Sequence, residues 1–167
     1  MEHNAETIKF DEAVIATGSA PIQIPGLEFD KEGVISSREL LDLNEVPEEL
    51  VVVGGGYIGM EAVTKFSRLG TEVKVVEAMD DILPHIDQDL VKQLKESNDF
   101  EEIYTDAEAK KIKYEDSKTV LVAERDDEEL RIPGDKVLVA VGRTPRPVLE
   151  DLDLEKTDTE IEDGFVR

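Results

Sequence analysis

In the middle of the chain, two continuous apolar runs flank a segment in which apolar residues recur at helical spacing. Residues 51–53 form a continuous apolar run that enters a glycine-rich turn, and residues 73–76 form a second such run. Between them Ile58, Ala62 and Phe66 recur at helical spacing. Continuous apolar runs are typical of strands buried on both faces of a parallel sheet. The pattern therefore predicts a strand, a helix and a second strand.

From about residue 103 the helical spacing ends, and apolar residues recur at every second position. Ile112 and Tyr114 alternate with charged residues, and Val120 and Val122 alternate after a turn at residues 116–117. Such alternation is typical of half-buried antiparallel strands. A charged hairpin tip is expected at residues 126–129, and residues 137–141 form one more buried strand. The prediction is an α/β, Rossmann-like dinucleotide-binding domain with a parallel sheet and an antiparallel β-meander.

The remaining segments divide into a few elements and two flanks. We expect a short buried strand at residues 12–18 and a helix at residues 87–95. Ser36 and Glu39 have the spacing of a capping box that opens a helix through Leu43. Taken together, the domain spans residues 46–146, between an N-terminal flank at 1–45 and a C-terminal flank at 147–167.

Three glycines at the turn have the spacing of a dinucleotide-binding fingerprint. Gly54 permits a tight turn, Gly56 lets the backbone approach a pyrophosphate, and Gly59 lets the helix pack closely on the strand. The helix that begins there offers free N–H groups and its positive dipole end to phosphates. A strand before the glycines, a helix after them and an acid downstream make the pattern specific.

Glu77 is that downstream acid, 23 positions after Gly54 and at the end of the second apolar run. A carboxylate there accepts hydrogen bonds from the adenosine ribose hydroxyls and repels a 2′-phosphate. Residues 77–82 contain no lysine or arginine. These features favour NAD over NADP, although one more surface acid in an acidic chain is the alternative.

Other polar residues carry less information. Glu61, in the first turns of the same helix, is explained by the helix dipole alone. His3 and His85 have no catalytic spacing, and we expect both to be solvated. Arg143 and Arg146 contact either an anionic ligand or neighbouring domain, or local acids. The pattern offers no catalytic residue and no metal site.

The charge excludes several classes of function. Asp and Glu number 41 against 19 Lys and Arg, which gives a net charge of −22. Nucleic-acid binding needs a basic patch, and no apolar run approaches a membrane span. The start has no signal-peptide pattern, so we expect a cytoplasmic protein. The excess acid favours salt adaptation, with an ordinary acidic protein as the alternative.

Several ordered segments together resemble a known family. Residues 10–21 resemble the "ATG" segment of the pyridine nucleotide–disulfide oxidoreductases, and residues 54–61 resemble their NAD fingerprint. Residues 71–77 with 82–87 resemble the dihydrolipoamide dehydrogenase branch in particular. Residues 135–145 resemble the strand that closes the NAD domain of that family.

The resemblance assigns roles to residues beyond the glycines. It implies that residues 54–61 bind the pyrophosphate, with Glu61 near the nicotinamide, and that Glu77 binds the ribose. It places two residues beside NAD and a short segment near FAD. The cofactor-binding residues it implies are Gly54, Gly55, Gly56, Tyr57, Ile58, Gly59, Glu61, Glu77, Ala109 and Gly142 for NAD, and Ala16, Thr17 and Gly18 for FAD.

The resemblance also implies a function. It is that of the NAD(H)-binding domain of a flavoprotein that passes electrons from dihydrolipoyl groups through a disulfide and FAD to NAD. Such enzymes serve 2-oxo acid dehydrogenase complexes and are homodimers through another domain. This sequence has no FAD fingerprint and no cysteine. We therefore expect an excised domain or a truncated gene product that binds NAD without catalysing.

Two alternatives remain open from the sequence. One is the corresponding domain of a related NADH oxidase or disulfide reductase. The other is a free-standing NAD(H)-binding module without a flavin partner.

Overall fold

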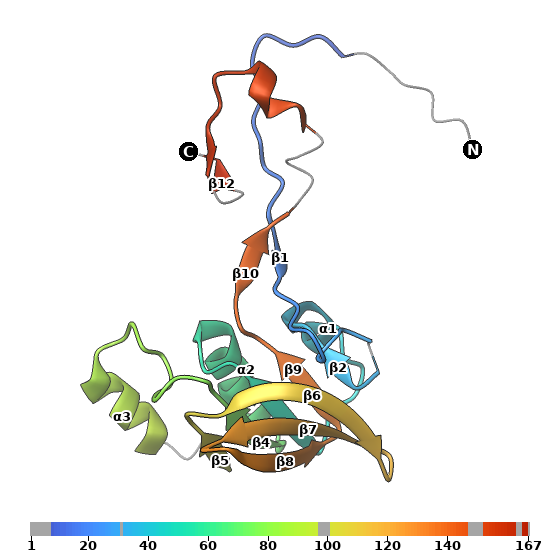
Figure 1. Ribbon diagram of the computed structural model, residues 1–167, viewed down its shortest axis with the longest axis vertical. Helices are drawn as coiled ribbons and strands as arrows, with labels where there is room; N and C mark the ends of the chain where they lie inside the picture. Colours follow the sequence, from blue (N-terminus) through green and yellow to red (C-terminus); the bar gives the residue numbers. More distant parts are fainter. Residues whose placement is uncertain (1–7, 31, 97–100, 147–151, 163–164, 167) are drawn as a thin grey trace. The chain divides into compact units, whose positions relative to one another are not determined.

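The computed structural model describes residues 8–30, 32–96, 101–146, 152–162 and 165–166 (Figure 1). The chain divides into two compact units. The larger is Pro21–Arg143, and the smaller combines Met1–Ala20 with Thr144–Arg167.

A five-stranded parallel sheet forms the centre of the larger unit, with the order β2-β9-β3-β4-β5. The strands are β2 (Val34–Ile35), β9 (Lys136–Val139), β3 (Glu49–Val53), β4 (Glu72–Val76) and β5 (Glu102–Tyr104). Val51, Val52 and Val75 are fully buried, as a parallel sheet covered on both faces requires. The α/β fold class predicted from the apolar runs is confirmed.

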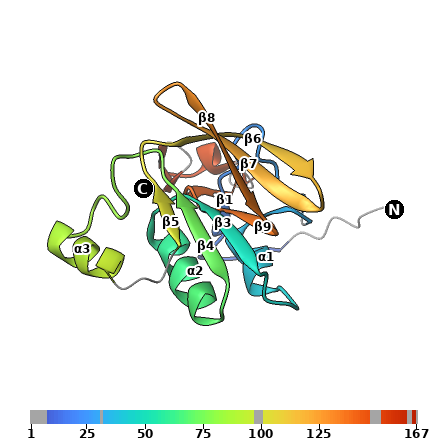
Figure 2. The same ribbon diagram turned by 90° about the horizontal axis from the view of Figure 1, so that it is seen from below.

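Helices α1 (Ser37–Leu41) and α2 (Tyr57–Arg68) pack on one face of this sheet, and α3 (Gln88–Glu96) adds Val91 to the same buried cluster. Figure 2 shows α2 on the side of β3 and β4 opposite the antiparallel strands. Its face packs Val63 and Phe66 into the same cluster as Val52 and Val75. Burial of each such side chain stabilises the fold by about 1.5–3 kcal/mol.

An antiparallel meander covers the other face, as predicted. It consists of β6 (Glu108–Glu115), β7 (Lys118–Arg125) and β8 (Glu128–Gly134), in that order. Leu121 and Ile132 of the meander join Val51 and Val137 of the parallel sheet in one buried cluster. The two tight turns place short polar residues at positive φ: Asp116, Ser117, Asp126 and Asp127.

The predicted capping box is present at the start of α1. Ser36 is the N-cap, its hydroxyl accepts from the Arg38 N–H, and the Ser36 N–H donates to the Glu39 carboxylate at 3.0 Å. The helix ends at Leu41, two residues before the predicted end at Leu43. The helix expected at residues 87–95 is α3, one residue later at each end.

The smaller unit contains short elements. It has a 3₁₀ turn at Leu154–Lys156 and a hairpin of β11 (Ile161–Glu162) and β12 (Phe165–Val166). Strands β1 (Ser19–Pro21) and β10 (Arg143–Pro145) pair with each other where the chain passes from one unit to the other. Among the residues described, none of the helices is both long and apolar enough to cross a membrane.

The buried strand expected at residues 12–18 is wrong. This segment has no strand, and Val14 is 92% exposed. An apolar run forms a strand when a neighbouring strand satisfies its backbone and a layer covers its side chains. In the described part of the chain neither condition is met for these residues.

Residues 21–45 were assigned to the N-terminal flank by their sequence. They include β2, which adds an edge to the parallel sheet, and α1, which packs Leu40 into the core. The role of the flanks as crossings to another domain stays a prediction.

Candidate functional site

The carboxyl ends of β3, β4 and β9 meet at one edge of the parallel sheet and border a cavity of about 680 Å³. In the sheet, β4 pairs with one side of β3 and β9 pairs with the other side of β3. In open α/β sheets, ligands bind outside the carboxyl ends of the strands where the strand order reverses. The cavity volume is in the range of small-molecule and cofactor sites, about 300–1,000 Å³.

The loop between β3 and α2 is held by close backbone contacts that only glycine allows. Gly54 has φ +106°, and its N–H donates to the Val76 carbonyl at 2.9 Å. A Cβ at Gly54 would lie 2.6 Å from the Ala140 carbonyl oxygen. A Cβ at Gly59 would overlap the Gly54 carbonyl oxygen. The first and third glycines thus fix the turn and the approach of α2 to the sheet.

Gly56 has different surroundings. It is the N-cap of α2, it lines the cavity, and a Cβ placed there would meet no atom within 4 Å. The first N–H groups of a helix have no partner within the helix, and the helix dipole is positive there. The open space in front of Gly56 can therefore take an anion such as a phosphate.

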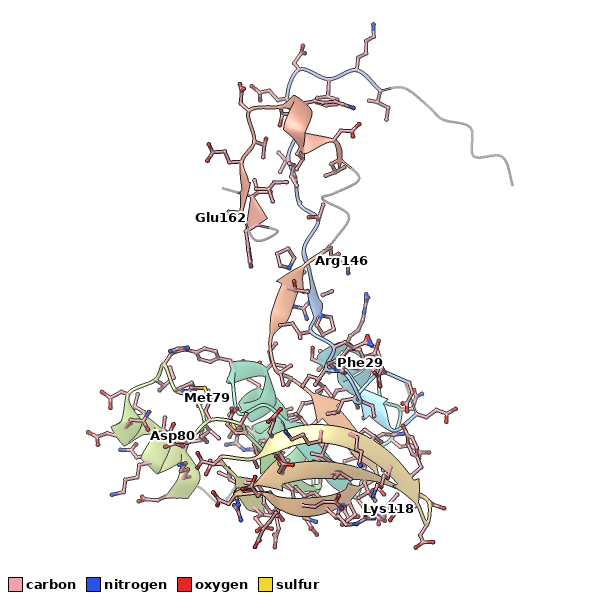
Figure 3. The ribbon with its side chains drawn as sticks, viewed as in Figure 1. Phe29, Met79, Asp80, Lys118, Arg146 and Glu162 are labelled. Atoms are coloured by element: carbon pink, nitrogen blue, oxygen red, sulfur yellow. The ribbon has the colours of Figure 1, made fainter. Side chains whose placement is uncertain are left out.

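Glu77 follows the end of β4 and lines the same cavity. Its Oε2 accepts from the Gly55 N–H at 2.6 Å, and its Oε1 accepts from the Met79 N–H at 2.8 Å. In Figure 3, Met79 and Asp80 lie on the segment that follows β4. Each carboxylate oxygen has two lone pairs, so both oxygens keep acceptor capacity for a ligand hydroxyl.

Most of the residues predicted for NAD surround this one cavity. Ala109 lies at a bulge in β6, and Gly142, with φ +124°, follows β9. Gly55, in the loop after β3, and Gly59, in the first turn of α2, are not among the residues that line the cavity. The predicted residues that line the cavity are Gly54, Gly56, Tyr57, Ile58, Glu77, Ala109 and Gly142.

Glu61 lies elsewhere on α2. It is exposed and borders a smaller hollow of about 330 Å³, together with Tyr57, Met60 and two other residues. Tyr57 lines both spaces. Ala16, Thr17 and Gly18 belong to the smaller unit and are not among the residues that line the cavity.

One wall of the cavity, the segment at residues 78–86, was not predicted from the sequence. Met79 and His85 both line the cavity and are exposed. His85 was expected to be solvated, and no role was expected for Met79. The segment is irregular, so no period marked it. The signal that could have found it is the group of apolar residues Met79, Ile82, Leu83 and Ile86 directly after a strand end.

The two arginines have different surroundings. Arg143 lines the cavity. Arg146, labelled in Figure 3, contacts the backbone of a segment that is distant in sequence: its backbone N–H donates to Gly18 O at 3.3 Å and its Nε–H to Ser19 O at 3.4 Å. Of the two, Arg143 is placed to meet an anionic ligand.

The family described as pyridine nucleotide-disulphide oxidoreductase matches residues 1–166. This chain belongs to that family. The family resemblance seen in the glycine and Glu77 segments is therefore confirmed.

Several pyridine nucleotide-disulphide oxidoreductases are similar in sequence. The dihydrolipoyl dehydrogenase of Haloferax volcanii is 46% identical over 97% of this chain, and that of Halobacterium salinarum is 40% identical over 95%. The dihydrolipoyl dehydrogenase of Staphylococcus aureus is 42% identical over 97%. The chain spans 34% of the length of each relative. The halophilic relatives support salt adaptation over an ordinary acidic protein.

Two solved members have a similar fold. LpdA from Mycobacterium tuberculosis has a TM-score of 0.77 and 29% identity, over 89% of this chain and 32% of that one. The HOCl-induced flavoprotein disulfide reductase RclA from Escherichia coli has a TM-score of 0.75 and 25% identity, over 89% of this chain and 33% of that one. The chain is thus similar to about a third of each protein.

Proposed function

We propose that the larger unit binds NAD(H) in the cavity at the carboxyl ends of β3, β4 and β9. The observation that carries the proposal is the open space at Gly56, at the head of α2 and beside the Glu77 carboxylate. The pyrophosphate lies against the Gly54–Gly56 loop and the first N–H groups of α2. The ribose hydroxyls donate to Glu77, and Ala109 and Gly142 border the cofactor.

The cofactor is NAD rather than NADP in this proposal. Glu77 can accept from a free 2′-hydroxyl, whereas a 2′-phosphate would bring negative charge against the carboxylate. Residues 77–82 also contain no basic residue that could pair with a 2′-phosphate.

The parent activity in this proposal is that of a dihydrolipoyl dehydrogenase. NAD supplies a hydride acceptor, and the protein holds and orients it. In the parent, electrons pass from dihydrolipoyl groups through a disulfide and FAD to NAD. The residues of this cavity do not hold that disulfide or the FAD. Within the same proposal the parent is a cytoplasmic homodimer that serves 2-oxo acid dehydrogenase complexes, Glu61 lies near the nicotinamide, and residues 16–18 contact FAD.

A disulfide reductase is the second candidate for the parent, favoured by the similarity to RclA. The two parents share NAD(P)H binding and differ in the disulfide they act on. Assay of the full gene product with dihydrolipoamide and NAD separates them. Rapid NADH formation supports the first candidate, and its absence in an NADH-oxidising protein supports the second.

The substitution Gly56→Thr tests the binding proposal. Threonine is about as good an N-cap as glycine, and the space at Gly56 accepts a side chain. The variant should fold normally while its side chain fills the space of the pyrophosphate. The chain has no tryptophan, so the fluorescence anisotropy of NADH reports binding without protein background.

The expected result is NADH binding by the parent chain and a loss of about tenfold or more in Gly56→Thr, which corresponds to at least about 1.4 kcal/mol. The thermal midpoint of the variant should stay within about 2 °C of the parent, as small stability changes imply. Unchanged NADH affinity in a folded Gly56→Thr protein would contradict the proposal.

A further inference from the structure

We propose that Glu77 is also a positioning residue for the glycine loop, and that it holds this loop in its binding conformation before any cofactor arrives. The inference rests on the proposed NAD(H) function for its consequence in binding. Its structural part concerns the ligand-free chain and can be tested alone.

The Glu77 carboxylate accepts a pair of backbone hydrogen bonds. Oε2 accepts from Gly55 N–H at 2.6 Å, across 22 positions in sequence, and Oε1 accepts from Met79 N–H at 2.8 Å. One side chain therefore connects the loop after β3 to the segment after β4. Hydrogen bonds to a charged acceptor are stronger than neutral ones, by roughly a factor of two.

The glycine loop and the segment after β4 also contact each other directly. The Leu83 N–H donates to the Gly55 carbonyl at 2.9 Å. A Cβ at Gly55 would lie 2.6 Å from Ile82 Cγ2 and 3.3 Å from Glu77 Oε2. Ile82 is fully buried. Gly55 is thus fixed by Leu83 through its carbonyl and by Glu77 through its N–H.

A glutamine cannot replace both hydrogen bonds of the Glu77 carboxylate. Two backbone N–H donors face its two oxygens, and a glutamine has one oxygen and one NH₂ group. In either orientation of the amide, one backbone donor of Gly55 or Met79 would face another donor. Glu77→Gln is therefore similar in shape but loses one of the two hydrogen bonds that connect the glycine loop to the segment after β4.

Glu77 thus affects both the preference between NAD and NADP and the conformation of the glycine loop. If Glu77 is replaced to admit a 2′-phosphate, the glycine loop loses its support at the same time. Binding of the pyrophosphate then weakens for any dinucleotide, including one that makes no hydrogen bond to residue 77.

The first experiment uses the ligand-free 167-residue chain and measures amide proton shifts and hydrogen exchange at Gly55 and Met79. In Glu77→Gln, at least one of these protons should move upfield and exchange about tenfold faster or more, as expected for loss of a charged hydrogen bond. Asp80→Asn is the matched control, because it removes the same charge from an exposed position in the same segment. The control should leave both amides unchanged.

The second experiment is a binding cycle with NADH and with an NADH analogue that lacks both adenosine ribose hydroxyls. A role in ribose binding alone predicts that Glu77→Gln weakens NADH and leaves the analogue unaffected. The positioning role predicts that about a tenfold loss persists with the analogue, while Asp80→Asn binds both ligands like the parent chain.

The outcomes separate the inference from the proposed function. Unchanged amides at Gly55 and Met79 in a folded Glu77→Gln protein overturn the positioning role, whether or not NADH binds. An analogue affinity equal to that of the parent chain also overturns it. Altered amides without NADH binding to the parent chain contradict the proposed function instead. If Glu77→Gln gives no folded spectrum, Glu77→Asp, which keeps the charge but is one methylene shorter, is read by the same criteria.

Discussion

Gly54, Gly56 and Gly59 belong to one motif but differ in what surrounds them. Gly54 needs positive φ, Gly59 needs close packing, and Gly56 has open space where a side chain would be. The sequence spacing predicted the tight turn at Gly54 and the close packing at Gly59, and both are present. The approach of a pyrophosphate to Gly56 stays a prediction. The hydrogen bonds from Gly55 and Met79 to Glu77 were not predictable, because the pattern of a loop does not show which backbone donors it leaves for a distant carboxylate.

Gly59→Ala should destabilise the chain. The added methyl overlaps the Gly54 carbonyl oxygen, so α2 must move away from β3, at a cost of about 1–3 kcal/mol typical of overpacking. Urea unfolding followed by circular dichroism measures this. Gly56→Thr is the control in the same loop and should unfold near the parent midpoint. Equal midpoints for Gly59→Ala and the parent chain would show that the close approach is not as described.

At the scale of elements, an ion-pair network joins the meander to the parallel sheet. Lys118 Nζ of β7 lies 2.6 Å from Glu49 Oε2 and 2.6 Å from Asp135 Oδ1 (Lys118 is labelled in Figure 3). Asp135 Oδ2 also accepts from the Glu49 N–H at 2.9 Å. Burial raises the pKa of Asp135, but the hydrogen bonds from Lys118 and from the backbone outweigh it and hold that pKa below its usual value.

Asp135→Asn should change how stability depends on acid. Because the folded pKa of Asp135 is lowered, its contribution is present above the unfolded pKa of about 3.9 and is lost as pH falls through the folded pKa. The variant should therefore be less stable than the parent at pH 6, and the difference should shrink below about pH 4. Urea midpoints from pH 6 to pH 2 test this, with Asp80→Asn as the control. A difference that stays constant across this range would contradict it.

The sequence predicted elements well where a run was both periodic and covered. Residues 51–53 and 73–76 became β3 and β4 because neighbours on both sides complete the sheet. Residues 12–18 have a similar composition, but Val14 is exposed and no strand forms. The two residues of β2 are too few to show a period, so that edge strand was missed. Composition indicates that a run can be a strand, and only tertiary neighbours decide whether it is one.

The net charge of −22 makes electrostatic self-repulsion a destabilising contribution for the chain as a whole. Raising KCl from about 0.01 M to about 0.1 M shortens the Debye length from about 30 Å to about 10 Å, which screens most of the self-repulsion. We expect the thermal midpoint to rise steeply over this range and more slowly above it. Thermal scans by circular dichroism across the KCl series measure this. A midpoint that rises only in proportion to salt up to several molar would indicate a general solvent effect instead of screening.

We propose that this chain binds NAD(H) at the cavity beside Gly56 and Glu77, and calorimetric titration of NADH and NADPH tests this. The titrations are done at low salt and at several molar KCl. We predict that NADH binds, that its affinity rises with salt because ligand and protein are both anionic, and that NADPH binds at least about tenfold more weakly because of Glu77. Absence of binding by either nucleotide to a chain that circular dichroism shows to be folded, or equal affinity for both, would contradict the claim.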